Sequence, residues 1–307
     1  MKVLITGGSG FIGSNAAEIL SIMGHELFII DDLSSGNADN LKNIEHTFYK
    51  LDIADKECED VFRKHKPDIV IHLAAQVDVK TSMEQPYLDT RSNILGLVNM
   101  LSLSAGYGIK KFLFASSAAI YGNNQLVPLN EEEKPDPVSP YGMSKSMGEF
   151  YCNKWNQIYG LKTLCFRFSN VYGPKQGTIG EGGVVSIFMQ RVLKGQPLYV
   201  FGDGDQTRDF IFVKDLAEAI CKGIESDMCG VCNLSTNTES SVNQLLDILK
   251  SLYPVEEIIH QQPRPGDIYK SRLNNARITK ALNWAPRFSF DEGIRETFRW
   301  FAGYIPK

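Results

Sequence analysis

The chain begins with a short apolar run, residues 2–6, that leads directly into a glycine-rich turn, Gly7-Gly8-Ser9-Gly10-Phe11-Ile12-Gly13. In a strand–turn–helix setting, glycines at this spacing allow a tight turn, a close approach of backbone to a bound phosphate, and tight packing of helix on strand. The helix that follows offers unpaired N–H groups and the positive end of its dipole to an anion. The turn therefore predicts a parallel α/β sheet with a phosphate site at its first loop.

An acidic residue stands where a dinucleotide site needs one. Asp31 ends a second apolar run, residues 26–30, roughly 20 residues after the glycines. A carboxylate there accepts a hydrogen bond from the adenosine ribose 2′-hydroxyl and repels a 2′-phosphate, so NAD is the predicted cofactor rather than NADP. Asp32 either shares this role or is solvated.

Strand and helix patterns alternate through the first half of the chain. The predicted strands are residues 2–6, 26–30, 47–51, 69–73, 111–115 and 162–168, and the predicted helices are residues 10–23, 56–64, 83–105 and 139–159. This order favours right-handed βαβ units in an α/β, Rossmann-like, doubly wound parallel sheet. Glycine and proline become frequent after Asn170. We therefore predict an NAD-binding domain over residues 1–170 and a smaller C-terminal substrate-binding lobe over 171–307, with a strand near 230–235 that could rejoin the sheet.

Composition excludes several classes of partner. The net charge of -4 gives no basic surface for nucleic acid or an anionic membrane. No apolar run approaches the ~20 residues of a membrane helix, and the N-terminal run is too short for a signal peptide. Six cysteines in 307 residues do not suggest a secreted disulfide framework, so a cytoplasmic location is expected. Cys229 and Cys232 lack a second ligand pair, and no metal site is predicted.

Two further motifs point to a family. Tyr141 and Lys145 form a Tyr-x-x-x-Lys on one face of a predicted helix, and Ser116-Ser117 follows the fifth predicted strand. With the glycine turn, they resemble the extended short-chain dehydrogenase/reductase superfamily, in particular the nucleotide-sugar branch of its NAD-dependent epimerase/dehydratase family. The similarity extends over nearly the whole chain. It implies a hydride-transfer enzyme that binds NAD and a UDP-sugar.

The resemblance also implies which residues make contacts. Expected cofactor contacts are Gly7, Gly10, Phe11, Ile12, Gly13, Asp31, Asp32, Leu33, Ser34, Gly36, Asp52, Ile53, Leu73, Ala74, Ala75, Asn93, Tyr141 and Lys145. Expected substrate contacts are Ser117, Tyr141, Asn170, Tyr199, Phe201, Arg208, Arg264, Asp267 and Ser271. Asn93 is nearly as well explained as an ordinary helix-surface residue, and one of the two aromatic residues as core packing. Ser271, a small residue four beyond Asp267, is expected to admit a 2-acetamido group.

The catalytic residues are expected to be Ser117, Tyr141 and Lys145. A hydroxyl proton must leave the sugar as hydride is removed, and a tyrosine can accept it if its pKa, ~10 when unperturbed, is lowered by a nearby cation. Lys145, one helical turn along, supplies that charge, and in the family this lysine also bonds the nicotinamide ribose. Ser117 stands where the family's serine or threonine bonds the reacting oxygen.

The residues after Ser117 narrow the reaction. The family's 4,6-dehydratases place an Asp-Glu pair there, whereas this chain has Ala118 and Ala119, which cannot transfer protons. With that reaction excluded, chemistry at C4 of the sugar remains. We favour 4-epimerisation of a UDP-sugar, either the glucose/galactose or the N-acetylhexosamine pair. The alternatives are an NAD(H)-dependent nucleotide-4-keto-sugar reductase, a UDP-uronate 4-epimerase, or an NAD-sensing protein of the same fold. The intact Tyr-x-x-x-Lys counts against the last.

Two expectations concern the surface. In the family, the helices predicted at residues 83–105 and 139–159 pair with those of a second subunit, so a homodimer is predicted; their apolar faces could instead pack only on their own sheet. Lys80 either faces the sugar or is solvated, and we favour the second interpretation.

Overall fold

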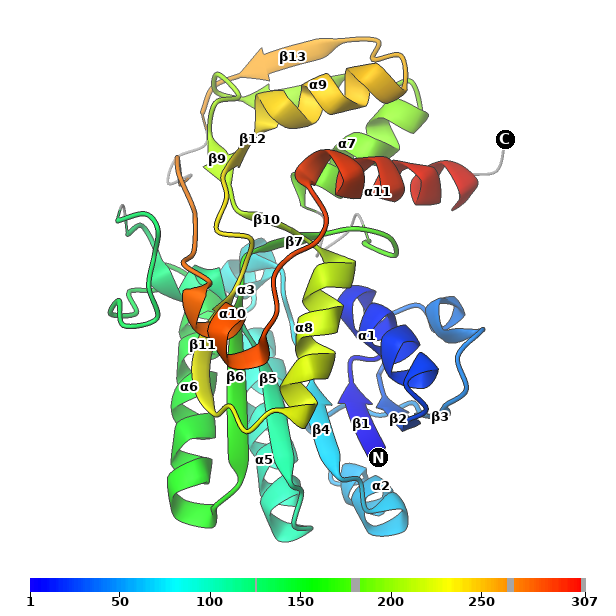
Figure 1. The fold of residues 1–307 in the computed structure, drawn as a ribbon, viewed down its shortest axis with the longest axis vertical. Coiled ribbons are helices and arrows are strands. Elements are labelled where there is room, and N and C mark those ends of the chain that lie inside the picture. Colours follow the sequence, from blue (N-terminus) through cyan, green and yellow to red (C-terminus); the bar gives the residue numbers. More distant parts are fainter. Residues whose placement is uncertain (125, 178–182, 264–267, 305–307) are drawn as a thin grey trace.

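A seven-stranded sheet forms the centre of the molecule (Figure 1). The computed structural model describes residues 1–124, 126–177, 183–263 and 268–304. The strand order is β11-β6-β5-β4-β1-β2-β3, and all neighbouring pairs are parallel. The strands are β1 (Lys2–Thr6), β2 (Glu26–Ile30), β3 (Thr47–Tyr49), β4 (Ile69–His72), β5 (Lys111–Ser117), β6 (Lys162–Phe168) and β11 (Gly230–Leu234). The predicted doubly wound α/β fold is confirmed.

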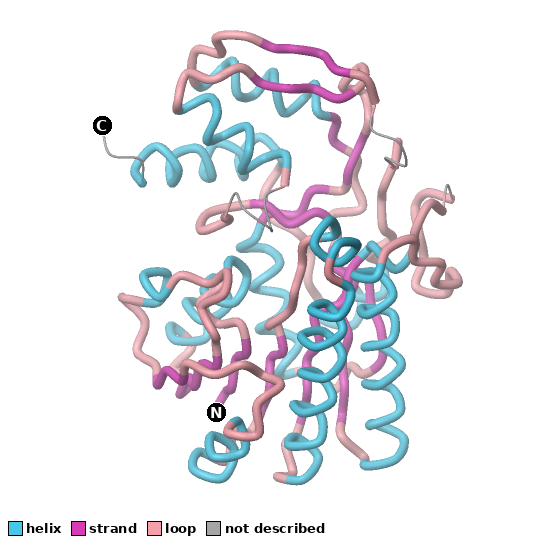
Figure 2. Tube along the Cα trace, turned by 180° about the vertical axis from the view of Figure 1, so that it is seen from behind, coloured by secondary structure: helices cyan, strands magenta, loops and turns pink. Residues whose placement is uncertain are grey.

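Helices cover both faces of this sheet (Figures 1 and 2). Because successive strand residues point to opposite faces, β1 contributes Val3 and Ile5 to one core cluster and Leu4 to the other. The first cluster lies under α1 (Phe11–Ile22), α8 (Val213–Glu225) and α10 (Ala276–Leu282). The second lies under α2 (Cys58–His65), α5 (Gly96–Gly106) and α6 (Pro140–Tyr159). Both faces are therefore dry, as a parallel sheet requires.

The single helix predicted over residues 83–105 is wrong. The structure has α3 (Val79–Glu84), α4 (Pro86–Thr90), a π-helical turn η2 (Arg91–Leu95) and then α5. Pro86 explains the first break, because proline cannot continue a helix from residue 85 but fits the first turn of a new one. The π-helical turn is a rare geometry that often accompanies functional sites.

The second lobe lies beyond the carboxyl ends of the central strands (Figure 1). It contains the pairs β7 (Asn170–Tyr172) with β10 (Phe210–Phe212), β8 (Leu198–Phe201) with β13 (Ile258–Gln261), and β9 (Thr207–Arg208) with β12 (Ser240–Ser241). Its helices are α7 (Val184–Leu193), α9 (Val242–Leu252) and α11 (Phe290–Tyr304), and they share one apolar core. Two short 3-10 helices, η1 (Ala38–Leu41) and η3 (Ala118–Tyr121), belong to the sheet side.

The chain beyond residue 170 contributes elements to both lobes. β11 pairs with β6 and so extends the central sheet, while α8 and α10 pack on one sheet face. The fully buried Asp209 carboxylate accepts hydrogen bonds from the backbone N–H groups of Thr236, Asn237 and Leu273. One side chain thus fixes two of the connections between the lobes.

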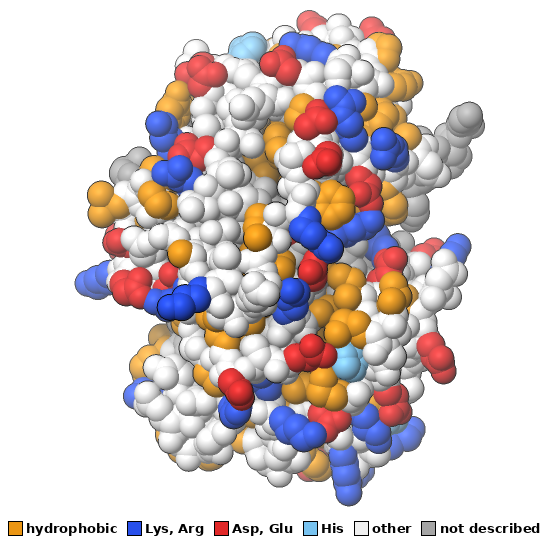
Figure 3. Space-filling model, viewed as in Figure 1, with side chains coloured by type: hydrophobic (Ala, Val, Ile, Leu, Met, Phe, Trp, Pro, Cys, Tyr) orange, Lys and Arg blue, Asp and Glu red, His pale blue; other side chains and the backbone are white. Residues whose placement is uncertain are grey.

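The surface mixes charges of both signs. Figure 3 shows acidic and basic side chains interspersed over the face that it presents, with no large area of one sign. Among the described residues, no helix is both long and apolar enough to cross a bilayer.

Candidate active site

The glycine turn leaves no room for side chains. Gly7 has φ +69°, and a Cβ there would lie 2.7 Å from the Ala74 nitrogen. A Cβ on Gly13 would lie 2.2 Å from the Gly7 carbonyl oxygen. Only glycine fits at either position, so the start of α1 stays close to β1 and its first N–H groups stay accessible.

Asp31 is held firmly at the end of β2. Its two carboxylate oxygens accept hydrogen bonds from the backbone N–H groups of Ser9 and Leu33, both at 2.9 Å. Burial raises the pKa of this carboxyl, and the two backbone bonds oppose that effect. Asp32 is instead exposed and bonds Ser34. Each Asp31 oxygen keeps a lone pair for a hydroxyl donor, which makes Asp31 the better placed of the two acids.

A cavity of about 660 Å³, the sheet-edge cavity, opens where the strand order reverses between β1 and β4. Both its place and its size are typical of ligand sites in open α/β sheets. Its lining includes the predicted residues Gly7, Gly10, Asp31, Asp32, Ser34, Gly36, Asp52, Ile53, Leu73, Ala74 and Ala75. A smaller cavity next to it, the inner cavity, is lined by Phe11, Ile12, Gly13, Tyr141 and Lys145 among others. Leu33 and Asn93 line neither cavity.

Arg91 on the π-helical turn is a wall residue that the sequence did not reveal. Its guanidinium donates to the carboxylates of Asp52 and Asp55, and Arg91 and Asp52 both line the sheet-edge cavity. The other Asp52 oxygen accepts the Ala54 N–H at 2.8 Å. The Asp52 carboxylate is thus already bonded within the protein, and no motif distinguishes Arg91 from a surface arginine.

Tyr141 and Lys145 come together at the start of α6. The helix is capped by Ser139, whose side chain accepts the Gly142 N–H, and Pro140 occupies its first turn. The Lys145 Nζ donates to the Ala115 carbonyl at 2.8 Å and lies 5.8 Å from the centroid of the Tyr141 ring. Lys145 is only 3% exposed, and burial lowers the pKa of its ammonium to about 8. It therefore carries most of its charge at neutral pH.

Ser117 is the last residue of β5, the strand on which α6 packs. Its Oγ accepts the Ala119 N–H at 3.1 Å and so caps η3. This leaves its hydroxyl proton available as a donor. The structure thus brings a donor, a phenol and a buried ammonium to one end of the sheet.

A buried polar cluster adjoins Lys145. The Asn93 amide nitrogen, with two hydrogens to donate, lies within hydrogen-bond distance of three oxygens, those of Asp89 at 3.0 Å, the Ser144 hydroxyl at 3.1 Å and the Gln76 carbonyl at 2.9 Å. The Asn93 oxygen accepts the Gln76 N–H at 2.8 Å. The Asn93 amide fixes the backbone that follows the sheet-edge residues Leu73–Ala75, and the cofactor contact of Asn93 stays a prediction. Asp89 was missed, because nothing in the sequence separates it from an ordinary helix acid.

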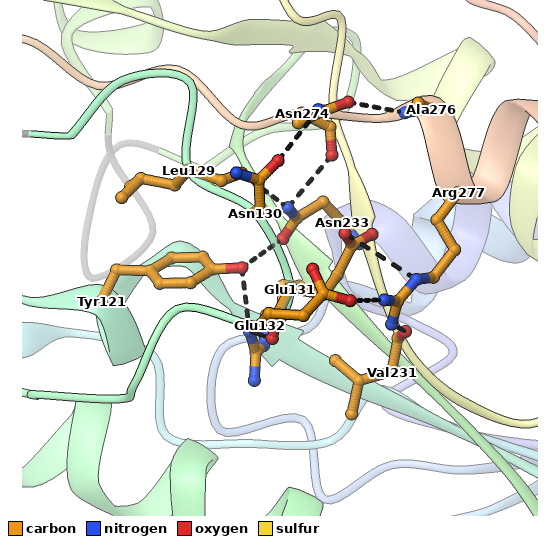
Figure 4. A network of polar contacts seen from close by, with 11 residues as sticks. Tyr121, Leu129, Asn130, Glu131, Glu132, Val231, Asn233, Asn274, Ala276 and Arg277 are labelled. Atoms are coloured by element: carbon orange, nitrogen blue, oxygen red, sulfur yellow. Dashed lines mark hydrogen bonds and ion pairs between the residues drawn. The ribbon is translucent and has the colours of Figure 1, made fainter.

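A second buried network supports the end of β5. Ser116 Oγ donates to Glu149 at 2.6 Å, and the Arg167 guanidinium bonds both Glu149 oxygens, at 2.9 and 2.8 Å. Arg167 also donates to the Tyr121 hydroxyl, which donates to Asn233 at 2.7 Å; Figure 4 shows Tyr121 pointing toward Asn233. A bidentate pair of this kind keeps two buried charges satisfied. It fixes Ser116 beside Ser117 and anchors η3.

The second lobe has its own cavity of about 490 Å³, the C-lobe cavity. Predicted substrate residues that line it are Asn170, Tyr199, Phe201 and Arg208. Tyr199 and Phe201, two apart on β8, both face it, as strand periodicity requires. The Arg191 guanidinium, not predicted, lies 4.7 Å from the Tyr199 ring centroid. Ser271 is not among the lining residues, and Arg264 and Asp267 lie outside the described residues.

Three other residues take unremarkable positions. Lys80 on α3 is exposed and lies 3.7 Å from Glu84, as expected for a solvated side chain. Cys232 is buried in β11, where burial raises the pKa of its thiol, while Cys229 is exposed. Within the described part of the chain, no three His, Cys, Asp or Glu side chains gather as metal ligands would.

A family model described as GDP-mannose 4,6 dehydratase matches residues 4–297. Among solved structures, the UDP-glucose 4-epimerase of Thermotoga maritima, with UDP-glucose, is 40% identical, covers 99% of each chain and gives a TM-score of 0.95. The UDP-glucose 4-epimerase of Thermus thermophilus, in complex with NAD, is 40% identical, covers 99% of this chain and 100% of its own, and gives 0.92.

A third structure differs in substrate. A UDP-N-acetylglucosamine 4-epimerase from Methanobrevibacter ruminantium, in complex with UDP-N-acetylmuramic acid, is 34% identical, covers 99% of each chain and gives a TM-score of 0.94. All three similarities extend over both lobes.

Proposed function

Since the chain belongs to the NAD-dependent epimerase/dehydratase family, we propose that it interconverts the C4 epimers of a UDP-sugar. The observation that carries the proposal is the pairing of Tyr141 with a buried, charged Lys145 beside the inner cavity. The two residues after Ser117 are alanines, so the site offers an acid–base group for the C4 hydroxyl and none there for C5 or C6.

The sheet-edge cavity fits NAD. A Cβ on Gly7 or Gly13 would collide with the backbone of Ala74 or of Gly7, so glycine lets the start of α1 pack close to β1, and the N–H groups of that first helical turn suit the diphosphate. The buried Asp31 carboxylate suits the ribose hydroxyls and opposes a 2′-phosphate. Lys145 would hold the nicotinamide ribose. When bound, NAD accepts a hydride from the sugar and returns it.

The protein's own groups carry the proton. Tyr141, with the Lys145 Nζ 5.8 Å from the centroid of its ring, accepts the C4 hydroxyl proton. Ser117 donates a hydrogen bond to the same oxygen, which stabilises the alkoxide character that develops there. After the 4-keto sugar turns over in the pocket, Tyr141 returns the proton to the other epimer. The protonation state at the end of the cycle equals that at the start.

The C-lobe cavity suits a uridine diphosphate. Tyr199 and Phe201 offer aromatic faces for a base, and Arg208 offers a planar guanidinium for phosphate oxygens. Asn170 would bond the sugar or the phosphate next to it. Arg264, Asp267 and Ser271 remain part of this proposal as diphosphate and sugar contacts. The named activities of the structural neighbours support both plain and 2-acetamido hexoses as substrates.

Incubation of the purified protein with single UDP-sugars and no added cofactor tests the function. We expect each C4 epimer to convert into the other, and acid-released nucleotide to give the mass of NAD. A 4-keto-sugar reductase would instead consume added NADH in step with product. Absence of bound nucleotide together with strict dependence on NADPH would contradict the epimerase.

A homodimer is part of the proposal. Met83, Tyr87, Leu95, Met147 and Phe150 expose between 48% and 82% of their surface along α3, α4, η2 and α6. Since α3, α4 and η2 all contact α6, these side chains lie on neighbouring elements, and a second copy would cover them. Light scattering should give twice the chain mass of 34.3 kDa, and Phe150→Glu should halve it. A wild-type monomer at micromolar concentration would reject the dimer.

The proposal also places the enzyme in the cytoplasm. All six cysteines carry free thiols, and five of them are buried. Reduced thiols suit a reducing compartment. Fractionation of cells, with activity as the marker, checks this location.

A further inference from the structure

The site contains a buried acid with no role so far. Asp89 on α4 is 1% exposed. Its carboxylate accepts hydrogen bonds from two neutral amides, the Gln76 side chain at 3.1 Å and the Asn93 side chain at 3.0 Å. Among the described residues, no ion pair includes Asp89. A carboxylate buried in this way is costly unless a positive charge lies nearby.

Lys145 is a buried positive charge that, in turn, needs a negative charge nearby. Its ammonium is buried, and its described hydrogen bond goes to a neutral carbonyl, that of Ala115. Burial lowers the pKa of the Lys145 ammonium, and the Asp89 charge is the strongest influence that opposes this. Burial likewise raises the pKa of the Asp89 carboxyl, and hydrogen bonds from Ser144 and Gln76, followed by the Lys145 charge, oppose that rise. The other titratable groups that face Lys145 are His72 from β4 and Cys152 and Tyr141 from α6. Burial lowers the pKa of His72 to about 3, so this imidazole stays neutral.

Hydrogen bonds lead from Asp89 to Ser144, the residue next to Lys145. Asn93 bonds both Asp89 and the Ser144 hydroxyl, and Ser144 precedes Lys145 on α6 and donates to the Tyr141 carbonyl at 2.9 Å. Asp89 on α4 and Asn93 on the π-helical turn are four residues apart, and both side chains are buried.

We infer that Asp89 is a positioning residue that acts as the buried counter-charge of Lys145 and keeps it an ammonium in the working site. It acts through Lys145 and touches neither cavity. Without Asp89, the lysine loses its proton at a lower pH, and Tyr141 then lacks the cation that makes it a base. The effect on turnover rests on the proposed function, whereas the charge pairing itself does not.

Nuclear magnetic resonance of protein labelled with ¹³C at the lysine ε-carbon tests the pairing. The Lys145 signal is assigned by its loss in Lys145→Met, and in the wild type it should titrate at about 8. In the near-isosteric Asp89→Asn, we expect the titration about one pH unit lower. Asp89→Glu should restore it. The control is Glu84→Gln, which removes a carboxylate that is 60% exposed on α3 and should leave the signal in place.

A reciprocal measurement does not depend on whether Asp89→Asn folds. Because proton binding at two sites is mutually linked, Lys145→Met must raise the pKa of the Asp89 carboxyl as much as Asp89 raises that of Lys145. An Asp89 titration unchanged in Lys145→Met, or a Lys145 titration unchanged in folded Asp89→Asn, would overturn the inference.

Turnover separates this inference from the proposed function. In Asp89→Asn, the alkaline limb of the kcat profile should move by the same pH interval as the Lys145 signal, with KM for the UDP-sugar unchanged. If the signal moves but no UDP-sugar is converted by the wild type, only the proposed function fails. If sugars are converted and the signal does not move, only the counter-charge fails.

Discussion

The sheet-edge and C-lobe cavities are built in different ways. The first, with the adjoining inner cavity, lies at the ends of neighbouring parallel strands, and the key groups of this pair of cavities, Asp31 and Lys145, are fixed by hydrogen bonds to backbone atoms. The second lies among two-stranded pieces, and its Arg208 sits on a strand of only two residues. Side chains at the ends of neighbouring parallel strands are held in place by the sheet itself. Side chains on the short two-stranded pieces depend instead on contacts from residues far away in the sequence. We therefore expect the first cavity to govern the chemical step and the second to govern binding.

The largest effect on turnover should follow from Tyr141→Phe, which removes the phenol oxygen proposed as the base. Loss of a general base typically costs ~10²–10⁴-fold in rate, so kcat should fall by that factor while calorimetric affinity for the UDP-sugar is retained. Tyr159→Phe, an exposed tyrosine at the end of the same helix, is the matched control and should keep full activity. Near-normal turnover in Tyr141→Phe would mean that another group is the base.

A smaller and different effect should follow from Arg208→Ala on the other cavity. Loss of a charge-assisted hydrogen bond to phosphate costs about 1.5–3 kcal/mol, so KM should rise about 10–100-fold with little change in kcat. Arg63→Ala removes an exposed arginine on α2 and serves as the control. A fall in kcat at unchanged KM would contradict the assignment of binding to the C-lobe cavity and of the chemical step to the sheet side.

The two cavities also differ in how far the sequence revealed them. On the sheet side, spacing alone identifies Gly7, Gly13 and Asp31, because turn geometry and the strand end leave few other residues possible. The motif Tyr141–Lys145 identifies the helix face in the same way. These signals are local, and the structure places all five residues along the two adjoining sheet-side cavities.

What the sequence did not reveal depends on distant contacts. Asp89, Arg91 and Gln76 all come from the segment between β4 and α5, in which the chain breaks at Pro86 and forms a π-helical turn that no periodicity predicts. Asn93 was identified, but its partners were not, since they come from three separate elements. In the second lobe, Arg191 stacks on Tyr199 across a connection that no motif marks.

Lys145→Met should show what a buried charge on the sheet side costs in stability. The ammonium has a pKa of about 8 when folded and ~10.4 when unfolded, so the unfolded chain binds this proton more tightly. The penalty is complete below pH 8 and is relieved as pH rises toward 10.4. The test is made in cofactor-free Asp89→Asn protein, because Lys145→Met alone would leave the Asp89 carboxylate without its counter-charge. In that background at pH 7, adding Lys145→Met should raise the free energy of unfolding in urea by about 1–3 kcal/mol. Lys80→Met, at an exposed lysine, should change nothing in the same background; a loss of stability on adding Lys145→Met would contradict the assigned penalty.

The smallest effect is expected at Ser271, on the substrate side. The segment that carries it is fixed nearby, since the Thr207 N–H donates to the Tyr269 carbonyl at 2.9 Å and the Leu129 N–H to the Arg272 carbonyl at 2.8 Å. Ser271 therefore lies on a segment beside β9, the strand that carries Arg208, although Ser271 itself does not line the C-lobe cavity. A one-residue shift would place Lys270 or Arg272 at the sugar instead. Lys270 is exposed, and the Arg272 Nε lies 3.6 Å from Glu239.

If Ser271 borders the sugar's 2-substituent, the wild type should convert UDP-N-acetylglucosamine as well as UDP-glucose. Ser271→Tyr should then lower kcat/KM for the acetylated sugar about five- to tenfold relative to UDP-glucose, because the ring fills the space of the acetyl group. Ser271→Ala, which stays small, should leave that ratio unchanged. A wild type that rejects the acetylated sugar, or a tyrosine variant that accepts it equally well, would show that Ser271 does not determine which 2-substituent the site accepts. A preference for a C6 carboxylate would point to Lys270 or Arg272, because either cation would pair with it.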